Sequence, residues 1–154
     1  MDVFFLDSSG LVKRFTREKG TSWILNLLKP SNGHTIFIAR ITSVEVVAAL
    51  TKQNRIGKLT VLELNKSIKR FKRSLQNRYA FVEISETLTN EAMILAEKYG
   101  LRGYDSVQLA AALKIQKRRL LLNLPPLTFV CADNNLNNAA TAEGLSVENP
   151  NNYP

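Results

Sequence analysis

The sequence predicts an α/β fold, a three-layer α/β/α sandwich around a central, mainly parallel sheet of four to five strands. Short apolar runs alternate along the chain with longer segments whose apolar residues recur at helical spacing, which is the pattern of strands joined by helical crossovers. The apolar runs are continuous, as expected of strands buried on both faces. Because the 154 residues contain no linker, repeat or low-complexity block, we expect one domain over residues 1–148 and a tail over residues 149–154.

The strands are predicted from apolar runs bounded by polar residues, glycine or proline. Residues 3–6 are four consecutive apolar residues, and residues 35–39 and 127–132 form two further runs of the same kind. Residues 81–84 form a shorter run. Residues 145–147 are a marginal edge strand, and their inclusion decides between four and five strands.

The helices are predicted from capping residues and apolar stripes. The clearest covers residues 60–77, where apolar residues recur at spacings of three and four and the other side is strongly basic. A helix over residues 105–119 is rich in alanine and apolar on most of its circumference, so we expect it in the interior. The other predicted helices cover residues 10–18, capped by Ser8 or Ser9, residues 21–28, 42–57 and 89–99, and a segment from Asp133 to Gly144.

The composition favours a cytoplasmic protein with an anionic partner. The 21 basic and 13 acidic residues give a net charge of +8, which favours nucleic acid or an acidic protein as partner. No apolar run approaches the roughly 18 residues of a membrane span, and the first residues do not resemble a secretory signal, so we expect no membrane association. With one cysteine, Cys131, and one histidine, His34, thiol or histidine catalysis and soft-metal binding are not expected.

Four acids occupy similar places in the predicted fold. Asp7 and Asp133 follow the first and fourth strands, Glu45 lies in the first turn of the helix after the second strand, and Asp105 opens the alanine-rich helix. Because ligands of parallel α/β sheets bind beyond the carboxyl ends of the strands, we expect all four at one rim. Carboxylates at one rim repel each other unless a cation neutralises them. The set therefore favours a hard divalent ion, Mg²⁺ or Mn²⁺.

Each acid also has a purely structural explanation. Residues 42–45 and 105–108 fit a capping box or a near relative of it, in which polar groups satisfy the free amides of a helix start. Asp7 and Asp133 also fit as simple strand-to-helix turn residues. Only the grouping of the four favours the metal site, so both explanations stay open.

The four acids lie in the segments Phe5-Leu6-Asp7-Ser8-Ser9, Thr42-Ser43-Val44-Glu45-Val46, Leu101 to Ala112, and Phe129-Val130-Cys131-Ala132-Asp133. These segments resemble PIN domains, and most closely the VapC-like toxins of prokaryotic toxin–antitoxin systems. The resemblance extends over essentially the whole chain. It implies a ribonuclease that hydrolyses phosphodiester bonds of RNA with Mg²⁺ or Mn²⁺, an antitoxin partner and a homodimer, and it carries the family's catalytic and metal-binding acids onto Asp7, Glu45, Asp105 and Asp133.

Three further residues are candidates for supporting roles. The family's small hydroxyl residue after the first Asp matches Ser8, which either supports Asp7 and water at the metal or only caps a helix. Arg40 leaves the second strand and Arg102 precedes Asp105, so both are candidate contacts to substrate phosphate, with a solvated or ion-paired arginine as the ordinary alternative. The rival to the nuclease is a catalytically silent PIN-like module that binds RNA or protein.

Overall fold

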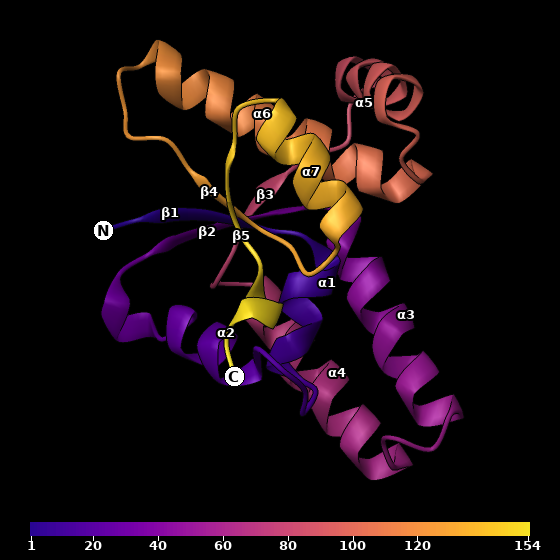
Figure 1. Cartoon of the computed structure of the whole chain (residues 1–154). Helices are drawn as coiled ribbons and strands as arrows, with labels where there is room; N and C mark the ends of the chain where they lie inside the picture. The colour runs from indigo at the N-terminus through magenta and orange to yellow at the C-terminus, as the bar shows by residue number, and fades with distance from the viewer.

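The computed structural model describes residues 1–154 and consists of three layers, with helices on both faces of one sheet (Figure 1). All neighbouring strands are parallel, and their order across the sheet is β3-β2-β1-β4-β5. The predicted α/β class is confirmed, and the marginal edge strand is present. The strands are β1 (Val3–Leu6), β2 (Thr35–Ala39), β3 (Ala80–Val82), β4 (Thr128–Val130) and β5 (Ser146–Glu148).

Seven α-helices and three short 3-10 helices connect the strands. Figure 1 shows α5, α6 and α7 on one face of the sheet and α1 to α4 on the other. The α-helices are α1 (Ser8–Leu11), α2 (Thr21–Leu27), α3 (Thr42–Arg55), α4 (Val61–Leu75), α5 (Glu86–Tyr99), α6 (Gly103–Leu121) and α7 (Asn134–Ala142), and the 3-10 helices are η1 (Val12–Arg14), η2 (Pro30–Asn32) and η3 (Pro150–Asn152).

Each face of the sheet has its own hydrophobic core. Successive side chains of a strand point to opposite faces, so in β1 Phe5 joins the core beneath α5, α6 and α7, while Leu6 joins the core beneath α1 to α4. Phe129 and Val130 of the neighbouring strand divide in the same way, and the rings of Phe5 and Phe129 stack with centroids 5.8 Å apart. This double burial is why the last two residues of both β1 and β4 are apolar, and it holds the carboxyl ends of these strands in place.

Several boundaries differ from the predicted ones for local reasons. The first helix begins at Ser8 and is capped by Asp7, so the predicted start near Gly10 with a Ser8 or Ser9 cap is wrong. Helix α5 begins at Glu86, three residues earlier than predicted, because Ser85 caps it by accepting a hydrogen bond from the amide of Leu88. Strand β3 ends at Val82.

The C-terminal residues that were expected to form a tail include η3. Pro150 is buried, and the ring of Tyr153 stacks on Trp23 of α2 with centroids 4.7 Å apart. The hydroxyl of Tyr153 also donates a hydrogen bond to Glu148 at the end of β5. None of the helices combines the length and the apolar character needed to cross a bilayer.

The strand order creates one position where a ligand site is expected. From β1 the chain moves outward to β2 and β3, and it later returns to the other side of β1 to add β4 and β5. The connections after β1 and β4 therefore diverge, and such switch points leave a crevice at the carboxyl ends of the strands. The backbone amide of Asp7 donates a hydrogen bond to the carbonyl of Val130 (3.1 Å), which joins these two strand ends directly.

Candidate active site at the carboxyl ends of β1 and β4

Asp7 is held in a buried position at the end of β1. Its side chain is only 2% exposed. The carboxylate Oδ1 accepts hydrogen bonds from the hydroxyl of Ser9 (2.8 Å) and from the amide of Gly10 (3.0 Å), and neither of these donors uses Oδ2. Burial raises the pKa of Asp7 from its ordinary 3.8 to about 6, although hydrogen bonds from Ser9, Gly10 and Cys131 act in the opposite direction. The charged form is therefore costly unless a cation compensates it.

Ser9 links Asp7 to the loop that follows β4. Its hydroxyl donates to Asp7 and accepts a hydrogen bond from the amide of Ala132 (2.9 Å). The residue that orients Asp7 is thus Ser9, not Ser8 as the family pattern suggested, and a role of Ser8 at bound water stays a prediction. Gly10 allows the start of α1 to approach the end of β4 closely, because a Cβ at this position would lie 2.9 Å from the carbonyl oxygen of Val130.

Asp133 occupies the equivalent position after β4. Its Oδ1 accepts a hydrogen bond from the amide of Leu136 (2.9 Å) and so caps α7. The turn explanation for Asp7 and Asp133 is therefore confirmed, because both cap the helix that follows them. It does not compete with a ligand role, since each cap uses Oδ1 and a carboxylate has a second oxygen.

Glu45 and Asp105 are not helix caps. The N-cap residue of α3 is Ile41 and that of α6 is Arg102, and neither helix start has a side-chain capping hydrogen bond. The capping-box explanation is thus wrong for both acids. Each lies in a first helical turn, where the helix dipole favours negative charge. Both are partly exposed rather than buried.

Gln108 fixes the orientation of Glu45. This residue of α6 is fully buried, and its Nε2 donates hydrogen bonds to Oε1 of Glu45 (2.7 Å) and to the hydroxyl of Thr42 (2.8 Å), both on α3. Sequence reasoning missed this role. The available signal was the spacing, because Asp105 and Gln108 are three residues apart and therefore share one helix face, in a stretch that is otherwise alanine-rich.

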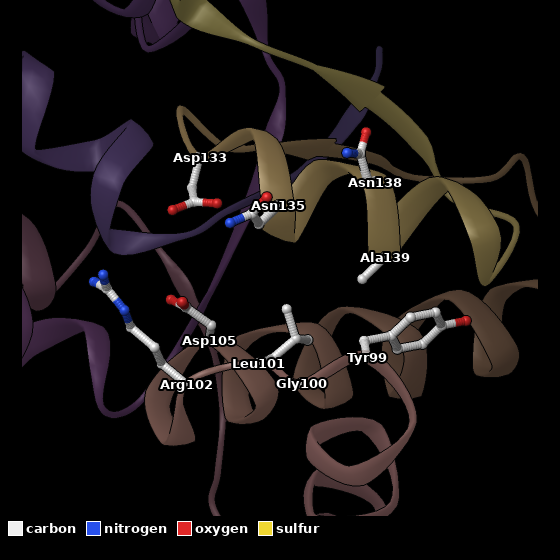
Figure 2. Close-up of a pocket in the computed structure, with 9 residues that line it drawn as sticks. All are labelled: Tyr99, Gly100, Leu101, Arg102, Asp105, Asp133, Asn135, Asn138 and Ala139. Atoms are coloured by element: carbon white, nitrogen blue, oxygen red, sulfur yellow. The ribbon is translucent and has the colours of Figure 1, made fainter.

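The four carboxylates belong to one electrostatic group. Burial raises the pKa of Asp105, and the charges of Asp133 and Glu45 raise it further, while Arg102 opposes them. Asp105 in turn contributes to the raised pKa of Asp7. Figure 2 shows the carboxylates of Asp105 and Asp133 directed into one pocket from α6 and from the start of α7. This polar pocket has a volume of about 480 Å³.

The donor chemistry of this group fits a hard divalent cation. All four side chains offer carboxylate oxygens, the ligands that Mg²⁺ and Mn²⁺ prefer, and their mutual repulsion is what such an ion relieves. In the present arrangement no three of them have the geometry of a ligand set around one point. The fit therefore rests on the type and charge of the donors, and the side chains must draw together to bind one ion.

The two candidate arginines lie in different surroundings. Arg40 forms an ion pair with Glu83, and its guanidinium lies over the ring of Phe81, 3.7 Å from the centroid. This interaction lowers the pKa of the Glu83 carboxyl. Arg102 is exposed and lines the polar pocket beside Asp105. The ordinary alternative of an ion-paired arginine thus applies to Arg40, whereas Arg102 is placed to meet an anion in the pocket.

Replacing Gln108 by methionine is expected to reduce catalysis more than folding. Methionine fills a similar volume but cannot donate to Glu45. On the sequence-based expectation that Glu45 is a metal ligand, loss of the partner that orients it typically costs about 10- to 100-fold in metal affinity or activity. Single-turnover cleavage of RNA at saturating and limiting Mg²⁺ measures the effect.

Gln116→Met is the matched control. Gln116 is also a buried glutamine of α6, but its Oε1 accepts from the amide of Leu127 and serves only the connection to β4. This variant should lose stability yet retain its activity per folded molecule. Equal activity losses in the two variants would mean that Gln108 only supports the packing of α6.

The chain was compared with known proteins. It is 31% identical over 150 residues to "Ribonuclease VapC45" of Mycobacterium tuberculosis (strain CDC 1551 / Oshkosh), and the match covers 96% of this chain and 95% of that protein. No family model matches.

Solved structures share the fold at low sequence identity. FitAcB from Neisseria gonorrhoeae superposes with a TM-score of 0.64 at 17% identity and covers 96% of this chain and 97% of its own. A toxin–antitoxin complex from Klebsiella pneumoniae gives a TM-score of 0.58 at 18% identity, covering 97% and 98% of the two chains. At these identities the structures show a common fold, which agrees with the sheet order and layers found here.

Proposed function

The chain belongs to the VapC-type family of PIN-domain proteins, and from this premise we propose that it is a divalent-metal-dependent endoribonuclease and the toxin of a toxin–antitoxin pair. The observation that carries the proposal is the convergence of the acids: Asp105 and Asp133 point into one pocket from separate segments (Figure 2). The charges of Asp133 and Glu45 accordingly raise the pKa of Asp105. Neither Glu45 nor Asp105 caps a helix, so capping does not explain why these two acids lie close to Asp133.

The carboxylates of Asp7, Glu45, Asp105 and Asp133 would hold the cation, Mg²⁺ or Mn²⁺. When bound, such an ion lowers the pKa of water and offsets the charge that develops on a phosphodiester during hydrolysis. Burial and the Ser9 and Gly10 hydrogen bonds fix Asp7, and Gln108 fixes Glu45.

The less buried acids and Arg102 would contact the reacting groups. Asp105 and Asp133 reach the pocket, so either can accept a proton from the attacking water. Arg102 would bind a substrate phosphate from the same pocket. Arg40 is paired with Glu83 and would bind a substrate phosphate only by exchanging Glu83 for it.

The proposed partners are RNA, a cognate antitoxin and a second copy of the chain. The net charge of +8 suits RNA, and one of the solved structures with this fold is a toxin–antitoxin complex. One side of α4 is basic and is a candidate surface for RNA or for an acidic antitoxin. It is formed by Lys66, Lys69, Arg70, Lys72 and Arg73.

Cleavage of RNA by the purified protein is expected to require a divalent ion. Because the carboxylates repel without one, chelation with EDTA should reduce cleavage by at least about 100-fold, and excess Mg²⁺ or Mn²⁺ should restore it. Gel analysis of a labelled single-stranded RNA measures the rate. Undiminished cleavage in EDTA would overturn the metal mechanism. RNA binding without cleavage under any metal would favour the silent PIN-like module instead.

A further inference from the structure

A second hollow adjoins the polar pocket. The two hollows share Arg102 and Asp105, and Glu45 lines the second one. Its volume is about 580 Å³, within the range of sites that bind small organic groups. We call it the apolar hollow, and its remaining lining includes Thr89, Ala92, Met93, Ala96, Tyr104 and Val107.

Two large side chains stand exposed around the apolar hollow. Tyr104 is 62% exposed and immediately precedes Asp105 in the first turn of α6, and Met93 of α5 is 60% exposed. Single exposed apolar side chains are common, but these two come from different helices and line the same space. Ala92 and Ala96 lie one turn apart on α5 and also line the hollow. Because their side chains are small, they leave the space between Tyr104 and Met93 open.

We propose that the apolar hollow binds one unpaired nucleobase of the RNA, stacked on the ring of Tyr104 and covered by Met93. This inference rests on the proposed function, because it takes the reacting phosphate to lie at Asp105 and Arg102. A nucleotide joined to that phosphate has its base within reach of the neighbouring hollow. The hollow is continuous with the site through these two shared residues, which is why a base, rather than an unrelated ligand, is its occupant.

The chemistry of the lining favours a stacked base over a phosphate. Apart from Arg102, which the hollow shares with the polar pocket, its lining holds no cation that could bind a phosphate. Every nucleobase, in contrast, has an uncharged face that stacks on aromatic side chains. Bases within a duplex are already stacked and cannot enter such a hollow without being unpaired. The proposal therefore makes the enzyme selective for single-stranded RNA, with Tyr104 and Met93 as specificity residues next to the reacting centre.

Binding of RNAs that lack single bases tests the hollow. The probe is a fluorescein-labelled single-stranded 12-nucleotide RNA of mixed sequence, with an abasic nucleotide placed at each position in turn. Anisotropy titrations use the Asp7→Asn background with Mg²⁺, so that the RNA stays intact. Because the base can no longer stack on the aromatic ring, an abasic nucleotide at the position that enters the hollow should weaken binding about tenfold.

Tyr104→Ala should weaken binding of the intact RNA by the same factor and abolish the penalty at that position, while Tyr104→Phe should keep it. Met93→Ala should show a smaller effect. Ile94→Ala is the matched control, because Ile94 is the next residue of α5 and is 57% exposed, but it lines a different hollow between α5 and α6; this variant should bind like the parent.

The alternative outcomes are distinct. If the same abasic position remains penalised in Tyr104→Ala, or if duplex RNA binds as tightly as the single strand, the base site is overturned. Loss of self-association in Tyr104→Ala, seen by size-exclusion chromatography with unchanged RNA binding, would also overturn it and assign the hollow to a contact between copies. If wild-type protein fails to cleave RNA while the abasic pattern holds, the nuclease proposal fails and the base site stands.

Discussion

Replacing Asp7 by asparagine is expected to lower RNA cleavage by about 1,000-fold or more while leaving the fold intact. The asparagine side-chain oxygen can still accept the hydrogen bonds that Oδ1 receives from Ser9 and Gly10, so the cap of α1 is retained. The negative charge that would hold a cation is lost. A catalytic cation contributes several kcal/mol to transition-state stabilisation, and each factor of ten in rate corresponds to about 1.4 kcal/mol. Single-turnover cleavage and circular dichroism measure the two effects separately.

Asp2→Asn is the matched control for this prediction. It makes the same chemical change just before β1 begins, at an exposed residue whose only side-chain ion pair is a 4.0 Å contact to His34. Its cleavage rate should remain within about twofold of wild type, because exposed ion pairs contribute little. If the Asp7 variant also cleaves at nearly the wild-type rate, Asp7 is only a cap and the metal site has been assigned to the wrong carboxylates.

The arrangement of Asp7 and Asp133 could be predicted because apolar runs in the sequence indicate which strands are buried on both faces. Residues 3–6 are apolar at every position, and the run ending before Asp133 is apolar except at Thr128, which favours central parallel strands. The ends of such strands meet at one edge of the sheet. The structure adds that β1 and β4 are direct neighbours, with Leu6 opposite Val130.

The supporting residues could not be predicted in the same way, because their roles depend on contacts between distant segments. Ser9 orients Asp7 only because the amide of Ala132 approaches it from the loop after β4. Gln108 reaches Glu45 only because α6 packs beside the start of α3. The pairing of Ser9 leaves no periodic or capping signal in the sequence, and for Gln108 the sequence offers only its three-residue spacing from Asp105.

Arg40 shows the same limit for an exposed residue. The sequence places it at the exit of β2 but does not say which strand lies beside it. Because β2 pairs with β3, with Ala39 opposite Val82, Arg40 emerges next to Glu83 and forms an ion pair with it. An arginine can bind either a phosphate or a carboxylate. The strand order is needed to know which of the two Arg40 meets.

The stability of the metal-free protein is expected to fall as the pH rises from about 4 to above 6, and Asp7 is the principal cause. The pKa of Asp7 is raised from 3.8 to about 6 in the folded chain, so between these values the folded state binds more protons than the unfolded state. Stability contributed by the protonated form is therefore present below pH 4 and is lost as the pH rises through 6. A shift of about two pKa units corresponds to on the order of 3 kcal/mol.

Comparison with Asp7→Asn isolates this effect from the other titrating groups. Chemical denaturation in EDTA at pH 4.5, 6 and 7.5 should show the variant to be increasingly more stable than wild type as the pH rises, since its side chain does not ionise. Asp105 and Cys131, the other titratable groups that act on Asp7, are present in both proteins. Excess Mg²⁺ at pH 7.5 should stabilise wild type far more than the variant, because an ion that binds only the folded state adds to its stability. If the difference in unfolding free energy between the two proteins does not change with pH, Asp7 is solvated or paired in the folded state. Its charge then needs no cation to compensate it.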